Sequence, residues 1–199
     1  MNSIKIISLF LIISLQSCFG QKKSTPKTIK IEEFNWTVTI PENFHLTSEA
    51  ILDNHLKKGL EIIEKNLGEE IINQAVTIFS FNNGDFNNLE ALWQPYDVGV
   101  DGDYMELYTE VNEIIYKTLE TQMPEVKLDS VTTSQKICGL DFLRFDMDID
   151  YLNGLEMKII NFTRLFSEKE FTFNITYMDE QIGEKMINAF LESKFNGLD

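Results

Sequence analysis

Cysteine is scarce in this chain of 199 residues, which contains Cys18 and Cys138 alone. Because Cys18 lies in an N-terminal segment that is lipidated or removed, the mature chain has no pair of thiols for an intrachain disulfide. An apolar core therefore has to supply the stability that disulfides give many exported domains. Cys138 adjoins Gly139 at a predicted turn and has no histidine beside it in sequence, which favours a buried, unreactive thiol over a reactive one.

Basic residues are also few. The chain has 17 Lys and Arg against 32 Asp and Glu, a formal net charge of −15, and no basic residue lies between Asn66 and Tyr116. So acidic a field repels phosphate backbones, and we expect no nucleic-acid partner. Acidic surfaces suit solubility, divalent cations or basic protein partners, and solubility is the simplest of these explanations.

The motifs of familiar catalytic machineries are missing. His45 and His55 are the two histidines, and their spacing fits no zinc site. The sequence has no GxSxG nucleophile motif and no glycine-rich phosphate loop. We therefore expect a protein that is not an enzyme. The alternative, a hydrolase acting on envelope material, would require one histidine to lie beside a carboxylate and a hydroxyl.

The first twenty residues are typical of a signal peptide. Lys5 precedes an apolar run, Ile6 to Leu15, that is too short to span a bilayer as a mature helix. Two processing sites compete at its end. Residues 15–18 (LQSC) resemble a lipobox, which would leave a lipid on Cys18, whereas signal peptidase could instead cut after Gly20. Either way we expect export, as a periplasmic or secreted protein or as a lipoprotein that touches the membrane only through its anchor.

The remaining chain has the size of one domain. Residues 21–28 are polar and basic and read as a linker, and residues 29–199 follow as a single domain, expected to be a monomer. Apolar periodicity predicts the order strand-strand-helix, strand-strand-helix, four strands, helix. The expected strands lie within 28–40, 74–81, 88–96 and 126–178, and the expected helices within 48–68, 103–124 and from 179 onward. The fold class is α+β, with a central antiparallel sheet flanked by helices.

The hairpin around Asn153 carries a register prediction. A two-residue loop would pair Asp150 with Met157 and place an acid on the apolar face. A three-residue loop over 152–154, with Gly154 in the left-handed conformation, pairs Ile149 with Met157 and keeps the faces consistent. The alternation then changes phase at Ile159-Ile160, which predicts a β-bulge there.

Three short motifs carry a resemblance to a known family. They are WTVTIPENF at 36–44, CGLDF at 138–142 and INAFLESKFNG at 187–197. Together with the element order they resemble the PsbP-like fold family, over residues 29–195. That family includes the extrinsic photosystem II protein, a nuclear-import factor that binds the small GTPase Ran, and bacterial lipoproteins of unknown role. The resemblance implies an α/β/α sandwich and no shared catalytic residues, so it leaves function open.

An acidic loop before the second predicted helix is the candidate metal site. Asp97, Asp101 and Asp103 lie among glycines, with Glu106 one turn into the helix. Calcium sites need several hard oxygens on a flexible loop, which makes a calcium-dependent binding module one interpretation. No other cofactor is expected. The alternative is a solvated loop in which Asp103 caps the helix.

The same loop is the candidate contact surface for a partner. Trp93 and Tyr96 stand directly before Asp97 and Asp101, which combines aromatic and acidic side chains in one short stretch. We expect a protein or another envelope component to bind there. Core packing of Trp93 is the alternative interpretation, and the function predicted overall is that of a non-enzymatic binding or envelope accessory domain.

Overall fold

A computed structural model of the chain describes residues 25–68 and 70–197, and the predicted signal peptide with Cys18 lies outside these ranges. The helices are α1 (Glu49–Leu67), α2 (Val98–Asp101), α3 (Tyr104–Gln122) and α4 (Glu180–Leu191), with a 3-10 turn η1 at Glu32–Phe34. The strands are β1 (Lys27–Ile31), β2 (Trp36–Ile40), β3 (His45–Leu46), β4 (Val76–Asn82), β5 (Asn88–Pro95), β6 (Lys127–Ile137), β7 (Leu140–Asp150), β8 (Glu156–Phe166), β9 (Lys169–Tyr177) and β10 (Lys194–Phe195).

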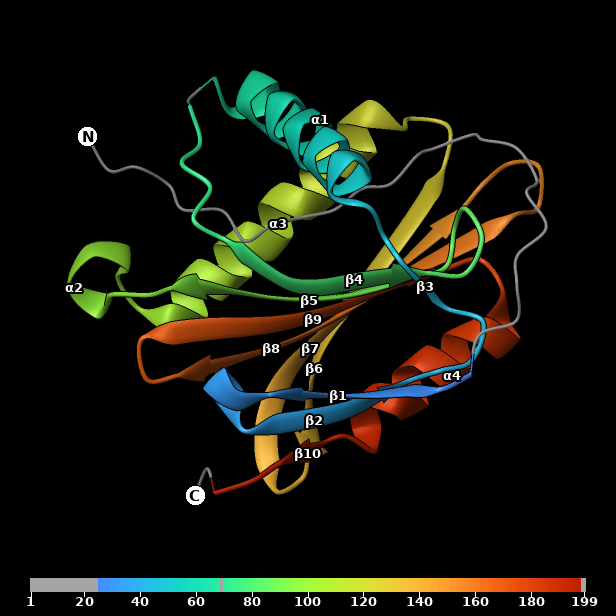
Figure 1. Cartoon of the computed structure of the whole chain (residues 1–199). Helices are drawn as coiled ribbons and strands as arrows, with labels where there is room; N and C mark the ends of the chain where they lie inside the picture. Colours follow the sequence, from blue (N-terminus) through green and yellow to red (C-terminus); the bar gives the residue numbers. More distant parts are fainter. Residues whose placement is uncertain (1–24, 69, 198–199) are drawn as a thin grey trace.

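These elements form three layers (Figure 1). The middle layer is a seven-stranded antiparallel sheet in the order β3-β4-β5-β9-β8-β7-β6. Helices α1 and α3 cover one face, and α4 covers the other together with a small sheet, β1-β2-β10. The predicted α+β class, with an antiparallel sheet between helices, is confirmed.

A cluster of aromatic rings fills the space between the large sheet and the small one. At its centre is Trp36 of β2, which is fully buried. Five phenylalanine rings lie with their centroids 5.0 to 6.0 Å from the Trp36 ring: Phe79, Phe171, Phe173, Phe190 and Phe195. The indole N–H of Trp36 donates to the Ser193 hydroxyl at 2.9 Å, so its one polar group is also satisfied.

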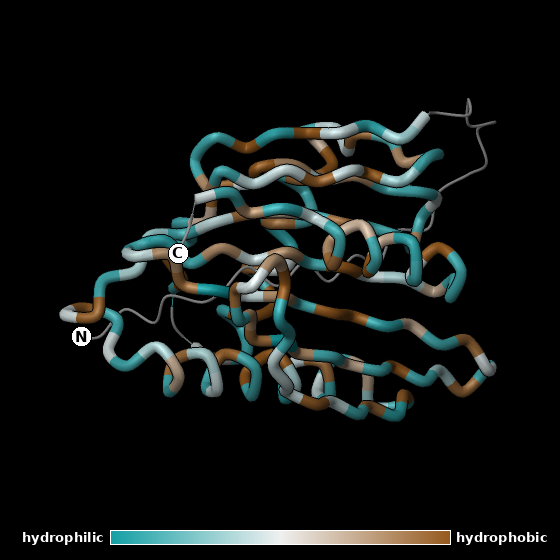
Figure 2. Tube along the Cα trace, turned by 90° about the horizontal axis from the view of Figure 1, so that it is seen from below, coloured by the Kyte–Doolittle hydropathy of each residue, from teal (hydrophilic) through white to brown (hydrophobic). Residues whose placement is uncertain are grey.

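A second apolar core lies on the opposite face, where α1 and α3 cover β7 and β8. Its buried members include Ile63 of α1, Val111 and Leu119 of α3, and Met147 and Ile159 of the sheet. Figure 2 shows apolar and polar residues interleaved along the strands, as expected when successive side chains point to opposite faces.

The predicted register of the β7–β8 hairpin is confirmed. Ile149 pairs with Met157 and Asp148 with Lys158. Gly154 has φ of 81°, the left-handed conformation that the turn requires and that glycine adopts without strain.

The predicted bulge at Ile159-Ile160 is wrong, because the pairing with β7 and β9 continues through both residues without a shift. Ile159 faces the core under α3 and Ile160 faces the aromatic cluster, and each is 3% exposed. Consecutive apolar residues here reflect a strand buried on both faces rather than a change of phase. The register shift that does occur is in β4, between Thr77 and Phe79.

The expectation of a buried Cys138 thiol is also wrong. The residue is exposed and lies in the tight turn between β6 and β7, where it adopts φ of 50°. Its Sγ lies 3.5 Å from the Phe195 carbonyl oxygen.

Gly183 of helix α4 packs tightly against the sheet. A Cβ at this position would lie 2.4 Å from two carbons of the Tyr177 ring. No side chain fits at that distance, so α4 can dock only because residue 183 has no Cβ.

We predict that Gly183→Ala destabilises the protein by about 1–3 kcal/mol, since the overpacking outweighs the roughly 1 kcal/mol by which alanine favours a helix. Urea denaturation measures the free energy of unfolding. Gln181→Ala, at an exposed position of the same helix, is the control and should change stability by less than about 0.5 kcal/mol. Equal stabilities of the two variants would contradict the close contact.

Candidate functional site

The segment between β5 and α3 stands out from the body of the molecule at the end of the sheet (Figure 1). It contains the four-residue helix α2 where the sequence predicts an irregular loop. We call residues 97–106 the acidic knob. Its fold depends on its own carboxylates: Asp97 Oδ1 accepts from the Gly99 N–H, and Asp101 Oδ2 accepts from the Asp97 N–H, both at 2.8 Å.

The predicted role of Asp103 as a helix cap is confirmed. Its Oδ1 accepts hydrogen bonds from the N–H groups of Met105 at 2.9 Å and Glu106 at 3.0 Å. Three of the four carboxylates proposed as calcium ligands, those of Asp97, Asp101 and Asp103, thus accept hydrogen bonds from backbone N–H groups. Across residues 25–68 and 70–197, no group of three or more His, Cys, Asp and Glu side chains is arranged to hold a metal ion. The calcium hypothesis stays a prediction.

Tyr96 anchors the knob, and its burial corrects the expectation of an exposed aromatic there. The residue is 5% exposed. Its hydroxyl donates to the Gly102 carbonyl at 2.5 Å, and its ring packs edge-on against Tyr104 with centroids 5.4 Å apart. One side chain thereby joins the end of β5 to the far end of the knob and to the first turn of α3.

Trp93 does not share a surface with Tyr96, and the interpretation that Trp93 packs in the core is confirmed. Residues three apart on a strand point to opposite faces, and Trp93 packs half-buried against the aromatic cluster on the other side of the sheet. The Lys169 ammonium lies 4.6 Å from the centre of the Trp93 ring and is paired with Glu33. Trp93 is therefore covered from above by an ion pair.

The exposed groups of the knob are its valines and acids. Val98 and Val100 are 71% and 72% exposed, and Met105 at the start of α3 is 50% exposed. Reasoning from the sequence missed these residues. The available signal was a V-x-V step among glycines and aspartates, where apolar side chains have no neighbouring apolar residue to pack on.

Beneath the knob, the face of the sheet that α3 covers carries a layer of buried polar side chains. Its charged members are Glu90 of β5 and Glu170 of β9, which are 5% and 1% exposed. Buried polar residues surround them on the same sheet: Asn88, Gln94, Asn161, Thr163, Thr172 and Thr176. Gln94 Nε2 donates to Glu170 Oε2 at 2.6 Å. The Oε1 atoms of both glutamates have no hydrogen-bond partner among the described residues.

Burial changes the protonation of both glutamates. It raises the pKa of Glu90 to about 8, against a smaller opposing effect of Asn174 on the neighbouring strand. It raises the pKa of Glu170 to about 7, where Gln94 and the nearby Tyr104 hydroxyl oppose the rise. The Tyr104 oxygen itself reaches hydrogen-bond geometry with no described residue. A charge without a partner is costly inside a protein. Both glutamates therefore stay protonated up to pH values well above those at which glutamate usually ionises.

The arrangement of layers and strands matches a known structure. The solution structure of cyanobacterial PsbP (CyanoP) from Synechocystis sp. PCC 6803 superimposes on the chain with a TM-score of 0.55. The match covers 91% of this chain and 98% of that one. The fold is PsbP-like. Sequence identity over the match is 10%. The similarity to PsbP therefore concerns the fold alone, and no functional residue can be assigned from it.

Other comparisons add no family. No protein-family model matches the chain, and no curated protein is similar to it in sequence. Within the described ranges, none of the helices combines the length and the apolar character needed to cross a membrane.

We predict that stability falls as pH rises from 5.5 to 8.5, by about 5 kcal/mol, of which roughly 3 kcal/mol comes from Glu90. The unfolded chain releases these protons near pH 4.5, whereas folded Glu170 and Glu90 keep them to about 7 and about 8. Their contribution is therefore fully present below pH 4.5 and is lost as pH rises through the folded values. Urea denaturation at several pH values measures the slope.

Glu90→Gln tests the assignment, because the amide cannot ionise. This variant should flatten the decline between pH 5.5 and 8.5, while Glu120→Gln on the exposed side of α3 should leave it as in the wild type. A decline that is as steep in Glu90→Gln as in the wild type would show that other groups cause it.

Proposed function

We propose that this chain is an exported, non-enzymatic binding domain of the cell envelope and that the acidic knob is its contact surface. The observation that carries the proposal is the exposure of Val98 and Val100 on a helix held firmly at both ends. Apolar side chains that stand out so far from a domain are typical of residues that bury against a partner.

The surroundings of the two valines define the partner. Asp97, Asp101, Asp103 and Glu106 belong to the same ten-residue segment, and the sequence from 67 to 116 contains no basic residue. The complementary surface has an apolar centre and a basic rim, since matched charges guide association and exclude wrong partners.

The anchoring of the knob favours the same function. Tyr96 ties its two ends together, and Asp97 and Asp103 cap its two helices. A loop that is ordered before binding loses less conformational entropy when the complex forms, so more of the contact energy appears as affinity.

The hydrolase alternative receives no support from the histidines. His45 and His55 make no side-chain hydrogen bond to a carboxylate or hydroxyl in the described part of the chain. A nucleophile activated by histidine needs such a bond.

We predict that a photo-crosslinking residue placed at position 98 captures one discrete partner in the native envelope. The same residue at position 152, where Leu152 is 84% exposed at the β7–β8 turn, is the control for exposure and should capture nothing discrete. Adding Glu106→Lys should lower the yield at position 98 several-fold by removing charge complementarity, and Glu120→Lys on the same helix should not. Equal adducts from positions 98 and 152 would refute the knob as a contact surface.

The intact mass of the mature chain tests the predictions of export and of lipid anchoring. Export predicts a mature N-terminus at Cys18 carrying lipid or at Gln21 without it. In the first case Cys18→Ala should move the protein from the detergent phase to the aqueous phase. A chain that keeps residues 1–17 in cells would contradict export.

A further inference from the structure

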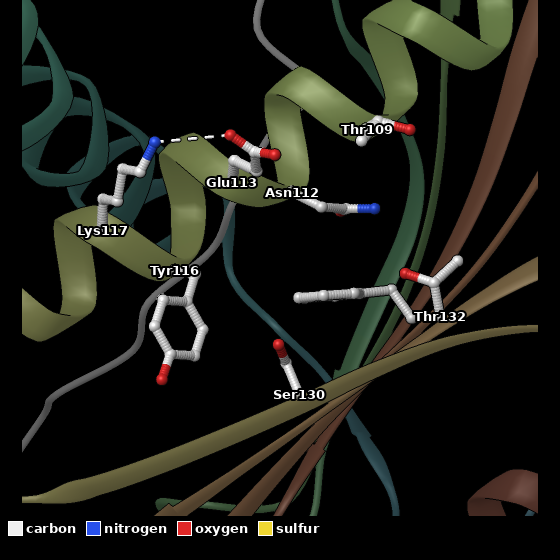
Figure 3. Close-up of a pocket in the computed structure, with 8 residues that line it drawn as sticks. Thr109, Asn112, Glu113, Tyr116, Lys117, Ser130 and Thr132 are labelled. Carbon is white, nitrogen blue, oxygen red and sulfur yellow. Dashed lines mark hydrogen bonds and ion pairs between the residues drawn. The ribbon is translucent and has the colours of Figure 1, made fainter.

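A cleft of about 340 Å³ opens between α3 and the edge of the large sheet (Figure 3). Helix α3 contributes Asn112 and Tyr116, β6 contributes Ser130 and Thr132, and β7 contributes Phe145. None of these residues belongs to the acidic knob, so the cleft is a separate site.

Asn112 is the feature of the cleft that folding alone does not explain. The residue is 8% exposed. The Tyr108 hydroxyl on the same helix lies near enough for the Asn112 amide to oppose the rise in the Tyr108 pKa, but Nδ2 reaches hydrogen-bond geometry with no described residue. Figure 3 shows the amide pointing away from α3 into the cleft. A buried donor without an acceptor destabilises a protein, whereas leucine at this position would not. The missing acceptor is what a ligand oxygen would supply.

The apolar surfaces of the cleft are fixed in place. Phe145 is 3% exposed and forms its floor. The Tyr116 hydroxyl donates to the Leu128 carbonyl of β6 at 3.2 Å, which holds the tyrosine ring against one wall. The hydroxyls of Ser130 and Thr132 lie along the opposite wall (Figure 3). A ligand therefore meets rings on some sides and groups that both donate and accept hydrogen bonds on others.

The charges at the cleft cancel each other. Lys117 Nζ lies 3.3 Å from Glu113 Oε2, and both side chains are well exposed at the rim. With the one cation paired to the one anion, nothing in the lining favours a charged ligand.

We propose that this cleft binds a neutral saccharide. A sugar ring has C–H faces that pack on aromatic rings and an edge of hydroxyls that donate and accept hydrogen bonds, which matches Tyr116 and Phe145 beside Ser130, Thr132 and Asn112. A volume of about 340 Å³ is at the small end of ligand pockets and suits one or two rings. Asn112 donates to a hydroxyl oxygen of the sugar.

The test is a titration of the ¹⁵N-labelled mature chain, followed by NMR, with glucose, N-acetylglucosamine and cellobiose as probes. Saturable shifts of the amides of residues 109–117 and 130–132 with at least one saccharide are the expected result. Triglycine is titrated in parallel. Shifts with triglycine and none with the saccharides would overturn the assignment of ligand class, and no saturable shift with any probe would overturn the site.

Asn112→Leu separates a binding role from a structural one. The variant should lose about tenfold in saccharide affinity, the effect of one hydrogen bond, while its Tm stays level or rises. Asn88→Leu is the matched control, because Asn88 is also buried with an unpartnered Nδ2 but lies outside the cleft. It should keep the affinity of the wild type. An Asn112→Leu variant that is destabilised and still binds would show that the amide serves the fold.

Discussion

The packing of phenylalanine rings around Trp36, two stacked and three edge-on, is the interaction on which the rest of the structure depends. The rings come from β2, β4, β9, α4 and β10, so a single cluster joins the small sheet and the last helix to the large sheet. Aromatic side chains bury more surface than other residues, and edge-on pairs add attraction beyond burial. Cys138 is free in the described part of the chain, and this aromatic cluster closes one face of the domain.

The aromatic cluster stabilises one face of the large sheet. The opposite face, under α3, contains buried polar groups that most protein cores lack. Under α3 the sheet buries Glu90 and Glu170, and the helix adds Tyr104, Tyr108 and Asn112. Each of the five has a polar atom that meets hydrogen-bond geometry with none of the residues the structure describes. Every such group costs stability. Natural domains keep such groups where function requires them and compensate elsewhere. Both the anchor of the acidic knob and the proposed saccharide cleft belong to this face.

The sequence predicts whatever depends on periodicity and fails where a second layer decides burial. The β7–β8 register follows from strict alternation and one glycine, since a slip would turn every side chain to the wrong face. Ile159-Ile160 misleads because both faces of β8 are covered. Glu90 and Glu170 read as solvent-facing positions of amphipathic strands, and only the placement of α3 makes them buried. The separation of Trp93 from Tyr96 could have been predicted from the strand period, because both residues lie within the strand expected at 88–96 and are three positions apart.

The buried polar layer forms where polar residues of α3 face polar residues of β5 and β9, which are distant from one another in sequence. Along α3, Tyr104, Tyr108 and Asn112 recur every four residues and form a polar stripe on the inner face, which becomes apolar at Ile115 and Leu119. The sheet changes in the same direction, from Glu170 and Gln94 on β9 and β5 to Phe145 and Met147 on β7. Isolated polar substitutions would not be expected to place the polar-to-apolar change along α3 opposite the same change across the sheet. The polar half of this interface is therefore part of how the domain is built, and a function that uses it needs no rearrangement of the fold.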